Sequence, residues 1–369
     1  MTYWPEWRYQ VCGAIRVKYD SLGGPTSFLL LPTSNELTNP GNTGKRSTFV
    51  NGPIYWSSSS GAHPVANHFF AAWQRNGWEA GPLGYPTTDE IVNPDGIGRR
   101  QEFQNTAAIY WRLNEAYAIR GAIRQKWNSL GAEQGILGYP VSDEINTVGD
   151  YTRFGTTTNA FERGALYWHP SSGHVRHGEW ILDLPVAFPG DDAIIGPGQS
   201  VEGDGNRAAP APEFAPMATS DCPAGTYGFT GDKAKFNCVV RLQDNGGTWW
   251  NARRGAPGQF GIEHFREDHD VEDEWVEWLI GRYNPTNIGG TRWAWGYRYR
   301  VTDPDSQFNV IGLRALTNAQ NVAASAGVDT QQFGLLTAHC YIPKTNDDEQ
   351  PIKIQFCPEE MPPGGPFRR

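Results

Sequence analysis

The chain has 369 residues with 31 basic and 40 acidic side chains, which gives a formal net charge of −9 at pH 7. The imbalance lies in the second half, because residues 1–185 hold 15 Lys/Arg against 16 Asp/Glu, whereas residues 186–369 hold 16 against 24. Acidic chains are poor partners for nucleic acid and anionic membranes, which attract basic patches. The sequence also lacks the run of about 18 apolar residues that predicts a membrane span.

The first half of the chain repeats itself at a period of 54 residues. Two sets of residues recur at this spacing, one aromatic and one of prolines: Tyr19, Trp73 and Trp127, and Pro32, Pro86 and Pro140. Residues 83–91 and 137–145 share the pattern Leu-Gly-Tyr-Pro-x-x-Asp-Glu-Ile, and residues 29–37 are a divergent copy. A fixed period of this size predicts an array of small units that bury their apolar faces against each other.

Each unit is predicted to be a short helix, a loop and a β-hairpin. In residues 122–131, Ile123, Trp127 and Leu130 recur at i, i+4 and i+7, and Gly131 suits a helix C-terminal cap. The Leu-Gly-Tyr-Pro loop follows, and the Asp-Glu pair after it is expected to be a solvated turn or a helix N-terminal signal. A calcium or sugar-hydroxyl role is the alternative for that pair. Turn sequences such as residues 93–96 then precede the hairpin.

The array begins in mid-unit. Tyr3-Trp4 is a spare copy of the closing Tyr-Trp pair, without its own preceding helix. Either this segment closes or caps the array, which would give a propeller-like ring, or the sequence begins within a longer array. No signal segment precedes it, so a secreted protein would be a mature form or a component released by lysis, such as a phage virion protein.

The second half is predicted to hold a linker and a second domain. Residues 185–219 are rich in Pro, Gly and Ala and are expected to form an extended tether between a repeat domain, residues 1–184, and a domain of residues 220–369. Five segments are β-rich: residues 236–242, 293–301, 308–313, 333–341 and 352–356. The predicted fold class is therefore mainly β with short helices, in which a repeat array is followed by an antiparallel β-sandwich or jelly roll.

Four of the five cysteines lie in the second domain. Cys222, Cys238, Cys340 and Cys357 predict two disulfides and an extracellular protein. Spacing favours Cys222–Cys238 and Cys340–Cys357, although all three pairings remain open, and zinc is disfavoured because there is no Cys-x-x-Cys. Cys12 is expected to replace a small core residue of the array.

Residues 263–274 concentrate seven carboxylates and two histidines. The simplest interpretation is a solvated acidic loop. One alternative is a calcium site, since Asp268, Asp270 and Glu272 would project to one side of an extended chain. The other is a pair of catalytic acids for glycoside cleavage. The sequence has no Gly-x-Ser-x-Gly, His-Glu-x-x-His or phosphate-binding loop.

Residues 3–181 resemble the LGFP repeat, a family of wall-associated modules found mainly in actinobacteria. Four features carry the resemblance, and they recur in the same register in the repeats: the aromatic residue before the loop, Leu-Gly-Tyr-Pro, Asp-Glu and the closing Tyr-Trp. The resemblance implies attachment to a cell wall that carries arabinogalactan and mycolic acids, alongside enzymes of the envelope.

These observations predict a non-catalytic extracellular or cell-surface protein that binds wall polysaccharide, either arabinogalactan or peptidoglycan. Neither a nucleic-acid partner nor a membrane span is expected. A homo-oligomer or a larger surface or phage-tail assembly is compatible with this function. An envelope hydrolase with a carboxylate site in residues 220–369, and an adhesin for protein partners, are the alternatives. The predicted glycan contacts are aromatic: Tyr55, Trp56, Tyr85, Tyr110, Trp111, Tyr139, Tyr167 and Trp168.

Overall fold

The computed structural model describes residues 9–182, 239–254, 261–290, 292–303, 307–321, 332–342, 352–353 and 357. The chain divides into two compact units, Met1–His177 and Gly178–Arg369. The predicted linker, residues 185–219, and the spare Tyr3-Trp4 segment lie outside the described residues, and the domain limits at 184 and 220 stay predictions. Among the described helices, none is both long and apolar enough to cross a membrane.

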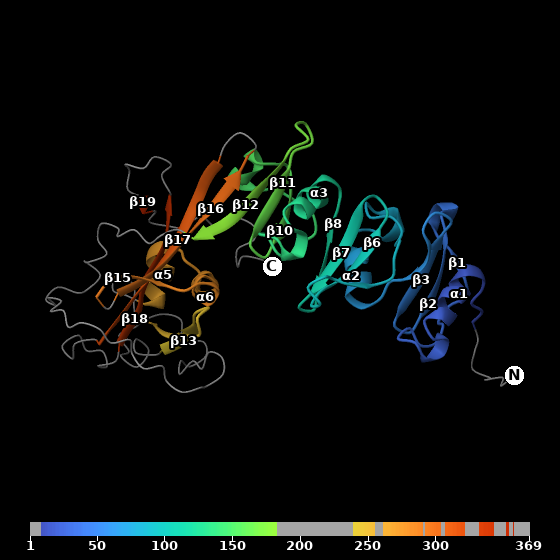
Figure 1. Cartoon of the computed structure of the whole chain (residues 1–369), viewed down its shortest axis with the longest axis horizontal. Coiled ribbons are helices and arrows are strands. Elements are labelled where there is room, and N and C mark those ends of the chain that lie inside the picture. Colours follow the sequence, from blue (N-terminus) through green and yellow to red (C-terminus); the bar gives the residue numbers. More distant parts are fainter. Residues whose placement is uncertain are drawn as a thin grey trace. The chain divides into compact units, whose positions relative to one another are not determined.

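The first unit contains three copies of one helix-and-sheet module, as the period predicted (Figure 1). We call them repeat 1 (residues 13–64), repeat 2 (residues 67–119) and repeat 3 (residues 121–168). Repeat 1 comprises α1 (Gly13–Ser21), β1 (Leu37–Thr38), β2 (Lys45–Phe49), β3 (Gly52–Ser57) and β4 (Gly61–Pro64). Repeat 2 comprises α2 (Asn67–Arg75), β5 (Ile91–Val92), β6 (Arg99–Phe103), β7 (Ala107–Arg112) and β8 (Glu115–Ile119).

Repeat 3 comprises α3 (Gly121–Ser129), β9 (Ile145–Asn146), β10 (Thr157–Phe161) and β11 (Gly164–Trp168). In every repeat, consecutive strands pair antiparallel in chain order, so the predicted hairpin is the centre of a larger meander. β12 (Val175–Leu182) follows and contains the boundary between the two units. A propeller-like closure is not confirmed.

The sheets of repeats 1 and 2 each contribute to two hydrophobic cores, because successive side chains of a strand point to opposite faces. In β3, Ile54 and Trp56 pack with Ile15 and Tyr19 of α1, in the core of repeat 1. Tyr55, between them, belongs to the core built around Trp73 of α2. Helices and sheets therefore alternate along the array, and the pairs Tyr55-Trp56 and Tyr110-Trp111 each join one repeat to the next.

The Leu-Gly-Tyr-Pro loops have the same conformation in repeats 2 and 3. Gly84 and Gly138 both have φ 71°, in the left-handed region that favours glycine. Indole Nε1 of Trp73 donates to the carbonyl oxygen of Gly84 at 3.0 Å, and Trp127 donates to Gly138 at 3.0 Å. The recurring helix aromatic therefore fixes the loop by a buried hydrogen bond, which explains why both recur with one period.

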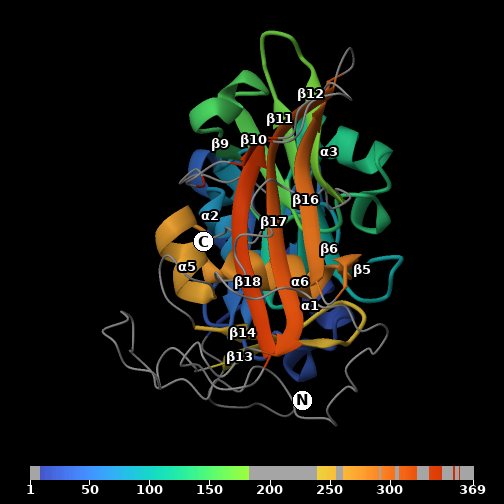
Figure 2. The same ribbon diagram turned by 90° about the vertical axis from the view of Figure 1, so that its left-hand side faces the viewer.

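The second unit is built on long antiparallel strands. β16 (Arg292–Thr302), β17 (Gln307–Asn321) and β18 (Gln332–Ile342) run side by side (Figure 2). β15 (Thr286–Gly289) pairs with β16, and β19 (Ile352–Lys353) pairs with β18. β13 (Val239–Gln243) and β14 (Trp249–Arg253) form a hairpin. The five predicted β-rich segments overlap β13, β16, β17, β18 and β19. A sandwich or jelly roll is not confirmed.

Two helices occupy the segment that was predicted to be a solvated acidic loop. α5 (Ile262–His269) contacts β18, and α6 (Asp273–Arg282) contacts β16. The loop prediction is wrong because Phe265, Trp275 and Leu279 are buried in the two helices, so Glu267, Asp268 and Asp273 belong to amphipathic helices.

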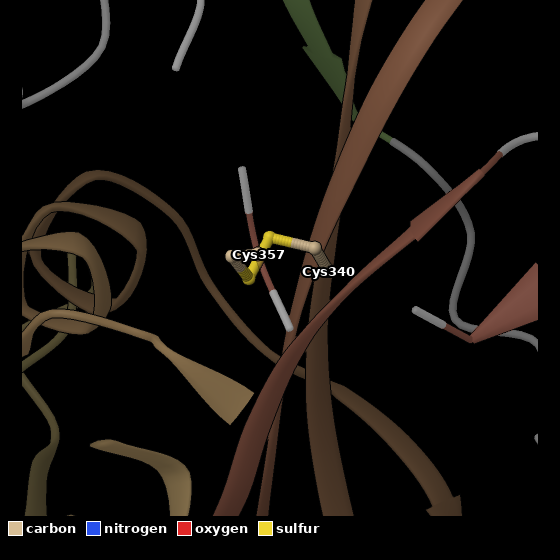
Figure 3. Close-up of a disulfide and its surroundings, with 2 residues drawn as sticks. All are labelled: Cys340 and Cys357. Atoms are coloured by element: carbon tan, nitrogen blue, oxygen red, sulfur yellow. A yellow bond between two sulfur atoms is a disulfide. The ribbon is translucent and has the colours of Figure 1, made fainter. Parts of the chain in front are cut away.

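The cysteines follow the prediction in part. Cys340 of β18 and Cys357 form a disulfide with Cα atoms 5.3 Å apart (Figure 3). Cys222 and Cys238 lie outside the described residues, so their pairing stays a prediction. Cys12 is a free thiol and is exposed, immediately before α1. Its predicted core position is therefore wrong.

Candidate functional site

The structure separates the eight predicted glycan contacts into two groups. The five tyrosines are buried, with exposed fractions between 0 and 6 %: Tyr55, Tyr85, Tyr110, Tyr139 and Tyr167. The three tryptophans are half-buried: Trp56, Trp111 and Trp168. A buried ring offers no face to a sugar, so the tyrosines leave the candidate contact set and the tryptophans remain in it.

The tyrosines of the Leu-Gly-Tyr-Pro loops instead hold neighbouring repeats together. The hydroxyl of Tyr85 accepts from Asn39 Nδ2 at 3.0 Å, and it shares a hydrogen bond with Thr43 Oγ1 at 2.7 Å. Tyr139 makes the equivalent contact to Asn93 Nδ2 at 3.2 Å and donates to Asp95. Each of these tyrosines thus reaches back into the preceding repeat.

The buried tyrosines predict a loss of stability at alkaline pH. Burial raises the pKa of Tyr55 to about 12, with a further contribution from Glu79, and burial also raises the pKa of Tyr110. Because an unfolded tyrosine titrates near pH 10, the folded state keeps protons that the unfolded state loses. Stability that is fully present below about pH 10 should therefore fall as the pH approaches 12. Melting temperatures measured between pH 8 and 12 test this expectation. Tyrosinate absorbance that developed fully near pH 10, with unchanged circular dichroism, would contradict it.

The three tryptophans occupy one equivalent position in the three sheets, and we call them the Trp row. Trp56 in β3 pairs with Lys45 on one side and Ala62 on the other, and Trp111 in β7 pairs with Arg99 and Ala116. Trp168 in β11 pairs with Thr157. Directly paired residues share a face of an antiparallel sheet. The indoles of Trp56 and Trp111 therefore each lie between a basic residue and an alanine, and that of Trp168 lies beside a threonine.

Ion pairs neutralise the two cationic side chains that pair with tryptophans of the Trp row. Lys45 Nζ lies 4.0 Å from Glu36 and donates to Thr38 Oγ1 at 2.7 Å, and Arg99 Nε lies 3.4 Å from Glu90. A half-buried indole next to such donors and acceptors presents one flat apolar surface and several polar groups without net charge. This chemistry matches a neutral sugar, which has apolar C–H faces and hydroxyls around its edge.

The aspartates of the two Asp-Glu pairs connect neighbouring repeats, whereas Glu90 is 56 % exposed and pairs with Arg99 of its own repeat. Asp89 of repeat 2 binds Lys18 Nζ at 2.9 Å and His63 Nδ1 at 2.6 Å, both in repeat 1. Burial alone would raise the pKa of Asp89, but the hydrogen bonds from His63 and Lys18 outweigh it, and the pKa lies below its ordinary value. Asp143 likewise binds Arg75 Nε at 3.1 Å.

The predicted calcium ligands do not follow an extended chain. Asp268 lies in α5 and binds His264 Nδ1 at 2.5 Å, Asp270 ends α5 with φ 51°, and Glu272 precedes α6. The premise of alternating carboxylates is therefore wrong. In the part of the chain that the structure describes, no three His, Cys, Asp or Glu side chains form a group that could hold a metal ion.

Two buried amides escaped the sequence-based prediction. Gln101 in β6 donates from Nε2 to the carbonyl oxygens of Pro64 and Thr88, each at 2.8 Å. Asn159 in β10 donates from Nδ2 to the equivalent carbonyls, Ala118 at 3.1 Å and Ser142 at 3.0 Å. Both tie the last strand of one repeat to the next repeat. The available signal was an amide side chain at the same position of two equivalent strands.

A family model of the LGFP repeat matches three segments of the chain, residues 29–81, 83–135 and 137–183. These segments follow the structural repeats in a shifted phase, since each begins at the Leu-Gly-Tyr-Pro loop or its divergent copy. The first two run into the next helix, the third runs into β12, and α1 precedes the first. No curated protein matches the chain.

Proposed function

Because the chain contains three LGFP repeats, we propose that it is a surface protein that attaches to the glycan of a cell wall through its first unit, without catalysing a reaction. The proposed ligand is wall polysaccharide of a mycolate-containing actinobacterium, arabinogalactan or peptidoglycan. The repeats are consistent with a cell-wall-associated protein, and the Trp row supplies the contact surface.

The recurrence of the Trp row is the observation that carries this proposal. Trp56, Trp111 and Trp168 stand at equivalent positions of three sheets, each half-buried against the core of its own repeat. Packing fixes the orientation of each ring in advance, so little conformational entropy is lost when a ligand binds. Three weak sites on one rigid array can hold a polymer by avidity, without a deep pocket.

Substitution of the Trp row tests the proposal. Each single change, Trp56→Ala, Trp111→Ala or Trp168→Ala, should weaken retention on purified wall glycan by about tenfold, and the triple variant should not be retained, because avidity is lost. Co-sedimentation of the full chain with wall glycan measures this, with circular dichroism as the test of folding.

Trp78→Gly is the matched control. Trp78 is 39 % exposed, lies outside the Trp row and has φ 54°, a conformation that glycine adopts without strain. This variant should bind as the wild type does. Full retention of the folded triple Trp variant would assign the attachment to another surface.

A further inference from the structure

The two junctions between repeats use equivalent acceptors but different donors. Asp89 and Asp143 are 54 residues apart and begin the Asp-Glu pairs of repeats 2 and 3. At the junction of repeats 2 and 3, the backbone N–H of Ala118 donates to Asp143 Oδ1 at 2.7 Å. The residue 54 positions before Ala118 is Pro64, which has no backbone N–H. Asp89 therefore cannot accept the backbone bond that Asp143 accepts.

The same backbone bond recurs before repeat 1. The backbone N–H of Gln10 donates to Asn35 Oδ1 at 2.9 Å. Gln10 lies 54 positions before Pro64, and its acceptor lies 54 positions before the acceptor of repeat 2. Of the three equivalent donor positions, Pro64 alone lacks the N–H. The missing donor is thus a particular feature of the junction of repeats 1 and 2.

An imidazole takes the place of the missing donor. His63, the neighbour of Pro64 in β4, lies with Nδ1 2.6 Å from Asp89 Oδ1. Its Nε2 lies 3.0 Å from the carbonyl oxygen of Ser60. The equivalent residue of β8 is Tyr117, since each pairs with the tyrosine of its own Tyr-Trp pair. A ring with two nitrogens therefore occurs here at the junction that lacks the backbone donor.

The surroundings of His63 call for a charged ring. The Asp89 carboxylate is ionised, since its pKa lies below the ordinary value, and the carbonyl oxygen of Ser60 carries no proton. Both neighbours are therefore acceptors, and only imidazolium has a proton on both ring nitrogens. A neutral ring keeps one of the two bonds and turns a lone pair towards the other acceptor.

Among the described residues, two other titratable side chains face this site, where His63 is 16 % exposed. Lys18 of α1 binds the same carboxylate, with Nζ 2.9 Å from Asp89 Oδ2, and a lysine stays charged throughout the neutral range. Tyr55 of β3 is directly paired with His63, and burial raises its pKa to about 12, so it stays neutral. The imidazole is therefore the group at this site whose charge changes near neutral pH.

We propose that His63 is a positioning residue for the Trp row: it replaces the backbone donor that Pro64 lacks, and it makes the junction of repeats 1 and 2 depend on a protonated imidazole. This junction joins the sheets that carry Trp56 and Trp111. Avidity requires a fixed spacing of such sites. The inference rests on the proposed function and adds its regulation. The connection is complete in mildly acidic solution and weakens as the pH rises through the neutral range.

A double-mutant cycle in the full chain tests the replacement. His63→Ala should lower the melting temperature by about 2–4 °C at mildly acidic pH and weaken retention on wall glycan by about threefold. Pro64→Ala restores the backbone N–H, so His63→Ala should have a much smaller effect in that background. Pro64→Ala alone is the reference, because it also loosens the unfolded chain. Additive effects of the two substitutions would overturn the inference.

The pH profile separates a proton-dependent connection from simple packing. A backbone amide does not titrate near neutral pH, so His63→Ala/Pro64→Ala should respond less than the wild type. The ratio of wild-type retention to that of the double variant should fall by about threefold between about pH 6 and about pH 8.5. Co-sedimentation at each pH measures the ratio, with circular dichroism as the test of folding. Identical profiles of the two proteins would contradict the proposal.

Failure of this inference and failure of the proposed function give different results. Additive melting temperatures, beside lost retention of the triple Trp variant, would overturn the role of His63 and leave the Trp row as the contact surface. Coupled melting temperatures with equal retention of the whole cycle would show that the junction does not position the row. Equal retention of the triple Trp variant as well would overturn the proposed function itself.

Discussion

Replacing Trp127 with alanine should lower the free energy of unfolding by about 3–5 kcal/mol. Trp127 is fully buried, its ring lies 4.7 Å from that of Tyr110 and 5.8 Å from that of Phe161, and its Nε1 donates to Gly138 O at 3.0 Å. The substitution leaves a cavity and a buried carbonyl without its donor. Denaturant unfolding followed by circular dichroism measures the change.

A second substitution at the same position separates packing from hydrogen bonding. Trp127→Phe keeps an aromatic ring but removes the indole N–H, so its effect should be intermediate, with a contribution of about 1–3 kcal/mol from the unsatisfied Gly138 carbonyl. A loss below about 1 kcal/mol for Trp127→Ala would show that this ring does not organise repeat 3.

Replacing Gln101 with leucine should lower the free energy of unfolding by about 2–4 kcal/mol, because two buried carbonyl oxygens would lose their donor together. These are the carbonyls of Pro64 and Thr88, on either side of the junction between repeats 1 and 2. Leucine fills a similar volume, so the effect reports the hydrogen bonds more than a cavity. Asn159→Leu should have the same effect at the junction between repeats 2 and 3.

Ser47 provides the matched control for the buried amides. It holds the same place in β2 as Gln101 in β6 and is fully buried, yet its hydroxyl has no hydrogen-bond partner among the described residues. Ser47→Ala should therefore change the free energy of unfolding by less than about 1 kcal/mol. A loss for Ser47→Ala as large as that for Gln101→Leu would mean that any change at this strand position is disruptive. The amides would then have no special role.

The sequence was informative where structure depends on neighbours along the chain. Ile123 and Trp127 have helical spacing, and the helix at Gly121–Ser129 matches the predicted residues 122–131 closely. The 54-residue period likewise predicted equivalent modules, because each module must bury an apolar face that it cannot bury alone. These predictions needed only local periodicity.

The sequence was misleading where structure depends on contacts between repeats. Tyr110 and Trp111 are adjacent and both aromatic, yet Tyr110 packs into the core of repeat 3 and Trp111 packs against the core of repeat 2. Amino-acid composition alone does not show whether one or both faces of a strand are covered by other parts of the protein. The partners of Asp89 were also unpredictable, since Lys18 lies 71 residues away in sequence.

The acidic segment was misinterpreted for a different physical reason. Its charges were weighed without the apolar residues within and after the segment: Phe265 is buried in α5, and Trp275 and Leu279 recur at i and i+4 in α6. Asp273 begins α6, where the helix dipole favours a carboxylate, and it also binds Arg266 at 2.6 Å. Acidic residues at a helix start are a folding signal, which the charge run concealed.

We propose that this protein holds wall glycan without cleaving it. The most direct measurement incubates the full chain with purified cell wall, then assays protein in the pellet together with reducing sugar and peptide in the supernatant of the same tube. We expect retention of the wild type, no retention of the folded Trp56→Ala/Trp111→Ala/Trp168→Ala variant, and no soluble fragments from either. Release of wall fragments by the wild type above a protein-free control would contradict this account and identify an envelope hydrolase instead.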